Sequence, residues 1–269
     1  MIVIIDSSKN QSIAAYLKKL WCYRNLILIF AYRNIQGKIA QTRLGIFIIL
    51  LQAIILTLVF GFFISRFITF LVSYPYLLFA VTGMMAWYIF SYIATFSGTS
   101  IMQNRQIASK IYFPRIILPF SYGLSVLLDF TGWLIVLTAL LIYYGIMPSY
   151  NFWAFFLFLI IDVITGLAVG LWIALLSIKN RDVALFAPLI IGIGMFFTPV
   201  FYPVKVLPEY LADILYFNPL ACVVEGFRWS LFNSPFDIRF LWGFLIILLL
   251  FITSVFFFVK KDGNMADNI

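Results

Sequence analysis

The sequence predicts an all-α integral membrane protein, and three observations support that prediction. Of its 269 residues, 64% are hydrophobic and only 10% are charged. Soluble domains are about half apolar and about a quarter charged, so this composition indicates a chain that lies in a lipid bilayer. Long uncharged stretches recur along the chain, and basic clusters stand beside them. We therefore expect six transmembrane helices, with short amphipathic helices outside the hydrocarbon.

The predicted spans follow from the length of the apolar stretches. A transmembrane helix needs about 20 mostly apolar residues to cross roughly 30 Å of hydrocarbon. The stretch 116–178 is about twice that length and contains a turn-forming run at 145–151, which predicts a hairpin of two spans. The fifth span contains Pro188 and Pro199 and is expected to kink. The six spans are predicted at residues 44–65, 77–96, 117–144, 152–178, 183–202 and 240–259.

The basic residues predict the orientation, because cytoplasmic loops are enriched in Lys and Arg. Fourteen of the 18 Lys and Arg residues fall on one side of the predicted spans, the side that carries both termini. We therefore expect a cytoplasmic N-terminal segment, residues 1–43, and a cytoplasmic tail, residues 260–269. The net charge of +8 is interpreted as a topology signal and not as a sign of nucleic-acid binding.

The residue inventory excludes several kinds of chemistry. The chain has no histidine, which removes histidine bases, Ser-His-Asp triads and most zinc sites. Cys22 and Cys222 are too far apart in sequence to form a CxxC motif, and two cysteines make no disulfide framework. Neither a P-loop nor a dinucleotide-binding glycine motif occurs. We expect no cofactor and no metal on this chain, so any ATP would be bound by another polypeptide.

Two predicted cytoplasmic segments lie outside the spans. Residues 13–28 place apolar side chains on one helical face, with basic side chains elsewhere, as in a helix at the membrane surface. That helix is either a topology anchor or a sliding surface where a substrate reaches the protein. The polar loop 97–115 is long enough for a short helix parallel to the membrane, and it either connects two spans or docks on a partner.

The outer loop, residues 205–232, predicts two short amphipathic helices. Asn218 can cap the second helix with Pro219 at its first position, and Glu225 precedes Arg228 by three residues. Both helices are too short to span, so we expect a re-entrant or surface pair over the outer end of the bundle.

Asp129 and Asp162 are the acidic residues deep in the predicted spans. A carboxylate in hydrocarbon costs roughly 3 kcal/mol on insertion scales, so each must be protonated, hydrogen-bonded or in contact with water. No Lys or Arg shares their spans, and we favour structural hydrogen bonding over a proton relay. Most aromatic residues near the span ends, Trp87 and Tyr88 among them, are expected to form interfacial belts or packing. Some of the aromatic residues could instead line a path for sugars, and the sequence does not say which.

Eight short motifs occur in order along nearly the whole chain. They are RNIQGKIAQTRLG (33–45), YPY (74–76) before Gly83 and Trp87, KIYFPRIILP (110–119), KNRDV (179–183), TPVFYP (198–203), LP (207–208), NPL (218–220) and EGFR (225–228). Together they resemble the membrane subunit of type-2 ABC exporters, and most closely the branch that exports O-antigen polysaccharides.

The resemblance implies an assembly and assigns roles within it. It implies a homodimer of the six-helix subunit, joined to two copies of a separate ATPase that holds ATP and Mg. The segment near the N-terminus becomes an interface helix, the loop 97–115 a coupling helix, and residues 205–232 a pair of gate helices. The residues assigned to ATPase coupling are Gln103, Asn104, Arg105, Lys110 and Arg115, and those assigned to the outer gate are Pro199, Tyr202, Pro208, Asn218, Pro219, Glu225 and Arg228.

The implied cargo is a polyprenyl-pyrophosphate-linked polysaccharide, moved across a bacterial inner membrane to its outer side. Arg33, Lys38 and Arg43 precede the first span, where the pyrophosphate would arrive, and Lys or Arg side chains suit phosphate. Positive-inside topology explains the same charges. Membrane lipids are further expected partners, and nucleic acid is not.

Two alternatives remain open. The cargo could be teichoic acid, capsule, or a smaller lipid or drug, since a fold does not determine a substrate. The chain could also be a membrane enzyme acting on polyprenyl-linked sugars. That enzyme would need paired carboxylates near a lipid phosphate, and the sequence has no such pair, so we expect a transport subunit that is not itself an enzyme.

Overall fold

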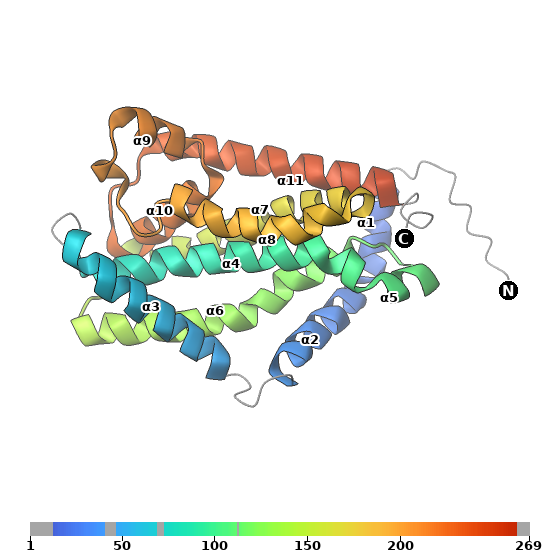
Figure 1. Ribbon diagram of the computed structural model, residues 1–269, viewed down its shortest axis with the longest axis horizontal. Helices are drawn as coiled ribbons and strands as arrows, with labels where there is room; N and C mark the ends of the chain where they lie inside the picture. The colour runs from blue at the N-terminus through green and yellow to red at the C-terminus, as the bar shows by residue number, and fades with distance from the viewer. Residues whose placement is uncertain (1–12, 41–46, 69–72, 112, 263–269) are drawn as a thin grey trace.

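The computed structural model describes residues 13–40, 47–68, 73–111 and 113–262, and over these residues the chain is helical without strands. The long helices run side by side along the longest axis of the molecule (Figure 1). Among the described residues, four helical segments are long and apolar enough to cross a membrane: Tyr76–Gln103, Ile117–Tyr144, Tyr150–Lys179 and Ile238–Asp262. The prediction of an all-helical membrane protein is confirmed in this form.

Two predicted spans are not among these four. Helix α3 (Phe47–Ile68) lies at the first predicted span, and the part of it whose side chains are described, Phe47–Phe63, is shorter than the other spans. Helix α8 (Arg181–Gly194) lies at the fifth predicted span and has 14 residues. Its length is therefore about 21 Å, at 1.5 Å per residue. The count of six spans therefore stays a prediction.

Helix α8 is shorter than the predicted span 183–202 for a local reason. After α8 comes one 3-10 turn, η3 (Met195–Phe197), and then Thr198 is extended at φ −115° and ψ 143°. Thr198 precedes Pro199, and the ring of a proline disfavours helical dihedral angles at the residue before it. Glycines near the end of α8, including Gly192 and Gly194, further lower its helix propensity.

The predicted hairpin of two spans is present. Helix α6 (Ile117–Tyr144) covers the residues of the third predicted span, and Gly145 caps it in a left-handed conformation with φ 63°, which glycine adopts without steric cost. The turn leads to η2 (Tyr150–Phe152), where the Ser149 side chain accepts the Asn151 N–H. Helix α7 (Trp153–Lys179) then returns across the bundle.

Helix α4 (Tyr76–Gln103) continues into the predicted coupling loop 97–115, so the first part of that loop is helical. The hydroxyls there bond back to helix carbonyls, Thr99 Oγ1 to Thr95 at 3.1 Å and Ser100 Oγ to Ser97 at 2.6 Å. These bonds supply hydrogen-bond partners for the polar side chains, so the helix can continue through them. The short helix predicted in the loop is α5 (Arg105–Lys110).

The N-terminal region differs from the single amphipathic helix predicted over residues 13–28. It contains two helices, α1 (Ile13–Cys22) and α2 (Arg24–Ala40), which are separated at Tyr23. Tyr16 is buried among protein side chains, whereas Trp21 is 70% exposed and Leu28 is also exposed. The predicted apolar face is thus divided between the protein interior and the surface, because α1 packs against the end of α11.

The most extensive helix contact in the described part of the chain joins α4 and α7. Glycines allow this close approach. A Cβ added at Gly170 would lie 2.7 Å from Ser97 Cβ and 3.2 Å from the Ala94 carbonyl oxygen, and one added at Gly166 would lie 2.8 Å from Ile93 Cβ. Small residues four apart are typical of tightly packed membrane helices.

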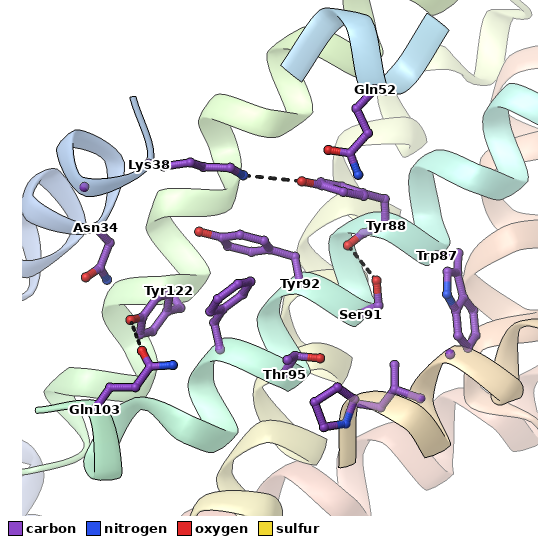
Figure 2. A pocket seen from close by; sticks show the side chains of 15 residues that line it. Asn34, Lys38, Gln52, Trp87, Tyr88, Ser91, Tyr92, Thr95, Gln103 and Tyr122 are labelled. Carbon is purple, nitrogen blue, oxygen red and sulfur yellow. Dashed lines mark hydrogen bonds between the residues drawn. The ribbon is translucent and has the colours of Figure 1, made fainter. Parts of the chain in front are cut away.

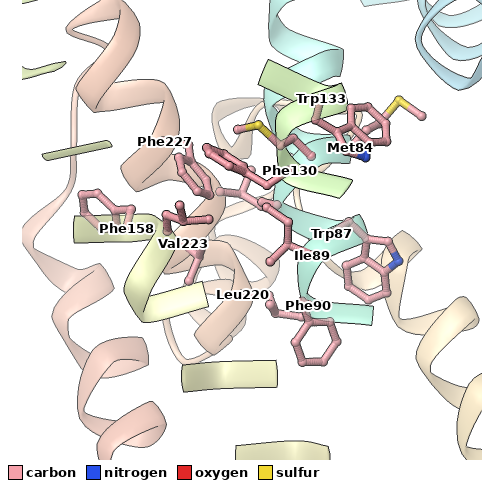
Figure 3. Close-up of a cluster of buried hydrophobic side chains, with 14 of the residues drawn as sticks. Met84, Trp87, Ile89, Phe90, Phe130, Trp133, Phe158, Leu220, Val223 and Phe227 are labelled. Atoms are coloured by element: carbon pink, nitrogen blue, oxygen red, sulfur yellow. The ribbon is translucent and has the colours of Figure 1, made fainter. Parts of the chain in front are cut away.

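Large apolar side chains surround this helix pair and form the main core (Figure 3). They come mainly from α4, α6, α7 and α10 (Pro219–Phe232), so the core joins α10 to the bundle. Its members include Met84, Ile89, Phe90, Phe130, Trp133, Phe155, Phe158, Val223 and Phe227.

The outer loop contains two short helices, α9 (Glu209–Tyr216) and α10. Asn218 caps α10 by accepting the Leu220 N–H at 2.9 Å, and Pro219 is its first residue. Short 3-10 turns, η4 (Val204–Val206) and η5 (Ile238–Phe240), flank the pair, and η5 leads into α11 (Leu241–Asp262). Figure 1 shows α9 and α10 at one end of the bundle, and α1, α5 and the C-terminal end of α11 at the other.

The close packing of α4 and α7 predicts the effect of adding one methyl group. Gly170→Ala should lower the unfolding midpoint of the detergent-purified protein, because overpacking costs about 1–3 kcal/mol. Gly37→Ala on α2 is the matched control, since a Cβ there meets nothing within 4 Å and alanine favours a helix by up to about 1 kcal/mol. Equal midpoints for the two variants would contradict the importance of this contact.

Candidate functional site

A cavity of about 660 Å³ lies among α2, α3, α4, α6 and α8. This volume is within the range of about 300–1,000 Å³ that is usual for ligand sites. Most of the lining side chains are aromatic or form hydrogen bonds, and Figure 2 shows many of them arranged around the same space. The lining consists of Asn34, Gly37, Lys38, Gln52, Trp87, Tyr88, Ser91, Tyr92, Thr95, Phe96, Gln103, Tyr122, Pro188, Ile191 and Gly192.

Lys38 is the charged side chain of this lining, and it pairs with Asp129. Its Nζ lies 2.5 Å from Asp129 Oδ1 and donates a hydrogen bond of 3.3 Å to Tyr88 Oη. The ammonium also lies 4.5 Å from the centre of the Tyr92 ring, which is favourable for a cation. Asp129 is 1% exposed, so the pair holds α2 against α6 through a buried charge.

The absence of Lys and Arg from its span does not leave Asp129 without a basic partner, and its carboxylate is hydrogen-bonded, as expected. The partner comes from a different helix, 91 positions earlier in the chain. Asp162 differs from Asp129. It is fully buried, and neither of its carboxylate oxygens has a hydrogen-bond partner among the described residues. The structural hydrogen bonding expected at Asp162 is therefore not found in that part of the chain.

The three basic residues expected to meet a pyrophosphate have different surroundings. Lys38 lines the cavity, as described above. Arg33 Nη2 donates to Asn104 Oδ1 at 2.5 Å, and its guanidinium lies 4.7 Å from the centre of the Phe30 ring. Arg43 lies outside the described residues. Their role toward a phosphate stays a prediction, and of the two described members of the set, Lys38 faces the cavity.

The residues expected to contact an ATPase divide into an exposed and an inward-facing group. Arg105 and Lys110 are exposed at the two ends of α5. Gln103 is also exposed, and it lines the cavity and accepts a hydrogen bond of 3.2 Å from Tyr122 Oη. Asn104 and Arg115 are buried. Within the predicted set, only Arg105 and Lys110 present charge at the surface.

Arg228 brings several predicted gate residues together at the other end of the bundle. It is 1% exposed, and its guanidinium donates to the carbonyls of Pro199 at 2.7 Å and Val200 at 2.8 Å, and to Glu225 Oε1 at 2.8 Å. The guanidinium also lies 3.4 Å from the centre of the Phe79 ring. Arg228 thereby joins α4, α10 and the segment after α8.

Two more predicted gate residues hold the segment after α8. Asn218 Nδ2 donates to the Phe197 carbonyl at 3.1 Å and to Thr198 Oγ1 at 3.2 Å. Tyr202 Oη donates to the Phe196 carbonyl at 3.1 Å. Pro208 stands at the N-cap position of α9 and Pro219 begins α10, so these two prolines set where the outer helices start.

A second cavity, of about 770 Å³, lies at this end and is lined by both acidic and basic residues. Its two arginines are paired: Arg228 with Glu225, and Arg239 with Asp237 and Asp213. Hydrogen bonds from the Arg239 side chain and backbone N–H lower the pKa of Asp237 to about 2. Lys205 and Glu209 complete the charged lining.

Several cavity residues were not predicted from the sequence as functional. Trp87 and Tyr88 were interpreted as belt or packing residues, yet both line the cavity, together with Gln52 of α3. Tyr88, Tyr92 and Phe96 recur every four residues, which places them on one face of α4. That spacing was available as a signal, but nothing in the sequence distinguishes this face from one that contacts lipid.

The ion pair of the cavity predicts a recoverable loss of stability. Lys38→Met should destabilise the protein by about 3 kcal/mol, because the buried carboxylate of Asp129 loses its counter-charge. Asp129→Asn in the same chain removes the uncompensated charge and should restore most of the loss, as measured by the unfolding midpoint in detergent. If the double variant were as unstable as Lys38→Met, the ion pair would not be the cause.

Three known proteins similar to this chain are O-antigen export permeases. The O-antigen export system permease protein RfbA of Klebsiella pneumoniae is 30% identical over 179 residues, which are 64% of this chain and 69% of that protein. Another RfbA of K. pneumoniae is 26% identical over 218 residues, covering 81% and 84% of the two chains. An RfbA of Myxococcus xanthus is 22% identical over 218 residues, covering 79% and 82%.

The family match extends over most of the described fold. Residues 25–232 match the ABC-2 type transporter family, and this range contains the cavity, α5 and both outer helices. The chain therefore belongs to the ABC-2 type transporter family, as a membrane-embedded, multi-pass permease subunit.

Proposed function

We propose that this chain forms the channel of an ATP-driven exporter that moves a polyprenyl-pyrophosphate-linked polysaccharide, of O-antigen type, across a bacterial inner membrane. Two copies of the chain act with two copies of a separate ATPase, which binds ATP and Mg. The end of the bundle that carries α1, α5 and the C-terminal end of α11 faces the cytoplasm. The glycan leaves at the end that carries α9 and α10.

The lining of the 660 Å³ cavity is the observation that carries this proposal. Four aromatic rings follow one another along it: Tyr88 and Tyr92 at 6.2 Å, Tyr92 and Phe96 at 4.7 Å, and Phe96 and Tyr122 at 5.7 Å between ring centres. Sugars present C–H faces that suit aromatic rings, and hydroxyls that suit amide and hydroxyl side chains. Such a series of rings fits a chain of sugars better than a single compact ligand.

The charge of the lining also suits a polymer that must move. Asn34, Gln52, Ser91 and Thr95 offer uncharged hydrogen-bonding groups, and the charge of Lys38 is offset by Asp129. Uncharged hydrogen bonds contribute only about 0.5–1.5 kcal/mol each. A glycan is then held by many weak contacts, which can be exchanged one by one as it advances.

Two further observations support the cargo and the partner. The similar proteins of Klebsiella and Myxococcus are named as O-antigen export permeases. The sequence has no P-loop of its own, and α5 presents Arg105 and Lys110 at the surface of the end assigned to the cytoplasm. A cytoplasmic ATPase could drive movement through that helix, provided its contacts differ between nucleotide states.

Filling the cavity should block export. Thr95→Trp places a large ring among the lining residues, and we expect surface O-antigen to fall roughly tenfold or more, which corresponds to a barrier higher by at least about 1.4 kcal/mol. The measurement is surface glycan in a strain that lacks its own permease and carries this chain with its ATPase. Lipid-linked glycan should accumulate inside the same cells.

The matched control is Thr138→Trp, which puts the same ring on the exposed side of α6, outside the cavity lining. Normal export by Thr95→Trp, with protein levels equal to the control, would reject the cavity as the glycan path. Export of a teichoic acid, capsule or drug in place of O-antigen would keep the transport role and change the cargo.

Reversing the charge of α5 tests the ATPase contact. Arg105→Glu with Lys110→Glu should abolish export and the stimulation of ATP hydrolysis by substrate, while the chain still inserts in the membrane. Lys260→Glu with Lys261→Glu is the control, because these two exposed lysines lie at the same end of the bundle on α11. Full export by the α5 variant would reject α5 as the coupling helix.

A further inference from the structure

Arg115 lies in the turn between α5 and α6, and it bonds to groups from two other elements. Its Nη1 donates to the Asp262 carbonyl at 2.6 Å and lies 3.8 Å from Asp262 Oδ1. Its Nη2 donates to the Ala108 carbonyl at 3.5 Å. One guanidinium therefore connects α5 with the C-terminal end of α11, although these residues are about 150 positions apart in the chain.

Asp262 extends the connection to α1. Its second carboxylate oxygen, Oδ2, accepts a hydrogen bond of 2.8 Å from Tyr16 Oη. Tyr16 is 5% exposed and packs in one cluster with Ile101 at the end of α4 and Phe258 of α11. A continuous set of polar contacts thus runs from α5 through Arg115 and Asp262 to α1.

The contact between Arg115 and α11 is strong for a physical reason. The last carbonyls of an α-helix have no partner within the helix, and the helix dipole makes that end negative. Arg115 supplies both a donor and a positive charge there, at a position where it is itself only 9% exposed. A planar guanidinium can donate hydrogen bonds in two directions with fixed geometry. A lysine ammonium on its flexible stem holds such bonds less rigidly.

The body of α5 is attached to the bundle as well as its ends. Ala108 is buried in a cluster with Phe30 of α2 and with Ile117 and Leu118 of α6. At the start of α5, Asn104 accepts the hydrogen bond from Arg33 of α2. Its exposed face still carries Arg105 and Lys110. Movement of α5 cannot occur without displacing its attachments, and Arg115 is the attachment that reaches α11 and α1.

We propose that Arg115 is a positioning residue that transmits movement of α5 to the end of α11 and, through Asp262 and Tyr16, to α1. This inference rests on the proposed function, in which an ATPase moves α5. It gives Arg115 a role different from the direct ATPase contact that the family resemblance implied. The two terminal regions then move with the coupling helix, although neither belongs to it.

The experiment measures hydrogen–deuterium exchange in the complex of this chain with its ATPase, in lipid nanodiscs, with and without a non-hydrolysable ATP analogue. In the wild type, nucleotide should change the exchange of α5, of the last turn of α11, and of α1. With Arg115→Gln the change should persist in α5 and disappear from α11 and α1. Tyr16→Phe removes one hydroxyl. In this variant the nucleotide-dependent change in exchange should persist in α5 and α11 and disappear from α1 alone.

Arg239→Gln, at the opposite end of the molecule, is the matched control and should leave all three responses in place. Responses in α11 and α1 that survive in Arg115→Gln would overturn the proposed link while leaving the proposed function intact. If Arg115→Gln does not assemble, Tyr16→Phe decides, and a retained response in α1 would overturn the link. No response of α5 in the wild type would overturn the proposed function and this inference together.

Discussion

The close approach of α4 and α7 is the constraint on which the rest of the structure depends. Gly166 and Gly170 bring the α7 backbone against α4, and any larger side chain there would meet Ile93 or Ser97. In a membrane, lipid is as apolar as the side chains, so helix association relies on packing and not on the hydrophobic effect. Helices α10 and α11 then pack on α7, while α3, α6 and α8 pack on α4. The remaining face of α4 lines the cavity.

Buried charges attach the peripheral elements to this central pair. Lys38 and Asp129 join α2 to α6, Arg228 joins α10 to the segment after α8, and Arg115 joins α5 to α11. A buried ion pair adds little net stability because desolvation opposes it, but breaking one is costly. In this chain, the charges therefore determine where each element sits more than how stable the bundle is. A carboxylate such as that of Asp129 is tolerated in the bundle because its partner is supplied by another helix.

The two ends of the bundle have different polar architectures, and the proposed transport cycle uses both. At the end with α5, arginines connect the short helix to α2, α11 and, through Asp262, to α1. At the other end, three side chains hold the non-helical segment 198–203. Arg228 donates to the Pro199 carbonyl within it, and Asn218 and Tyr202 donate to the Phe197 and Phe196 carbonyls just before it. Between them runs the aromatic face of α4. A movement applied to α5 would reach the proposed glycan path through α4, which directly precedes α5.

Composition and local pattern were enough to predict much of the fold. A bilayer requires every backbone group to be bonded within its own helix, so long uncharged stretches had to be helices. Local residue chemistry predicted three further features: the turn at 145–151, the two outer helices and the capping role of Asn218. The family resemblance was likewise visible in short motifs, and the match of residues 25–232 confirms it.

The tertiary structure decided which residues meet. Three features depend on helices that are far apart in sequence: the partner of Asp129, the inward direction of Arg115 and the cavity-facing side of α4. Local patterns contain no information about which distant helices meet. The early end of α8 and the division of the N-terminal segment into α1 and α2 were likewise missed, because an apolar stretch specifies burial but not where a helix stops. The sequence by itself determined that this chain is a helical membrane protein with charge gathered at one end. Only the packing of α4 on α7 decided which polar residues face the cavity, because it determines how each helix is rotated.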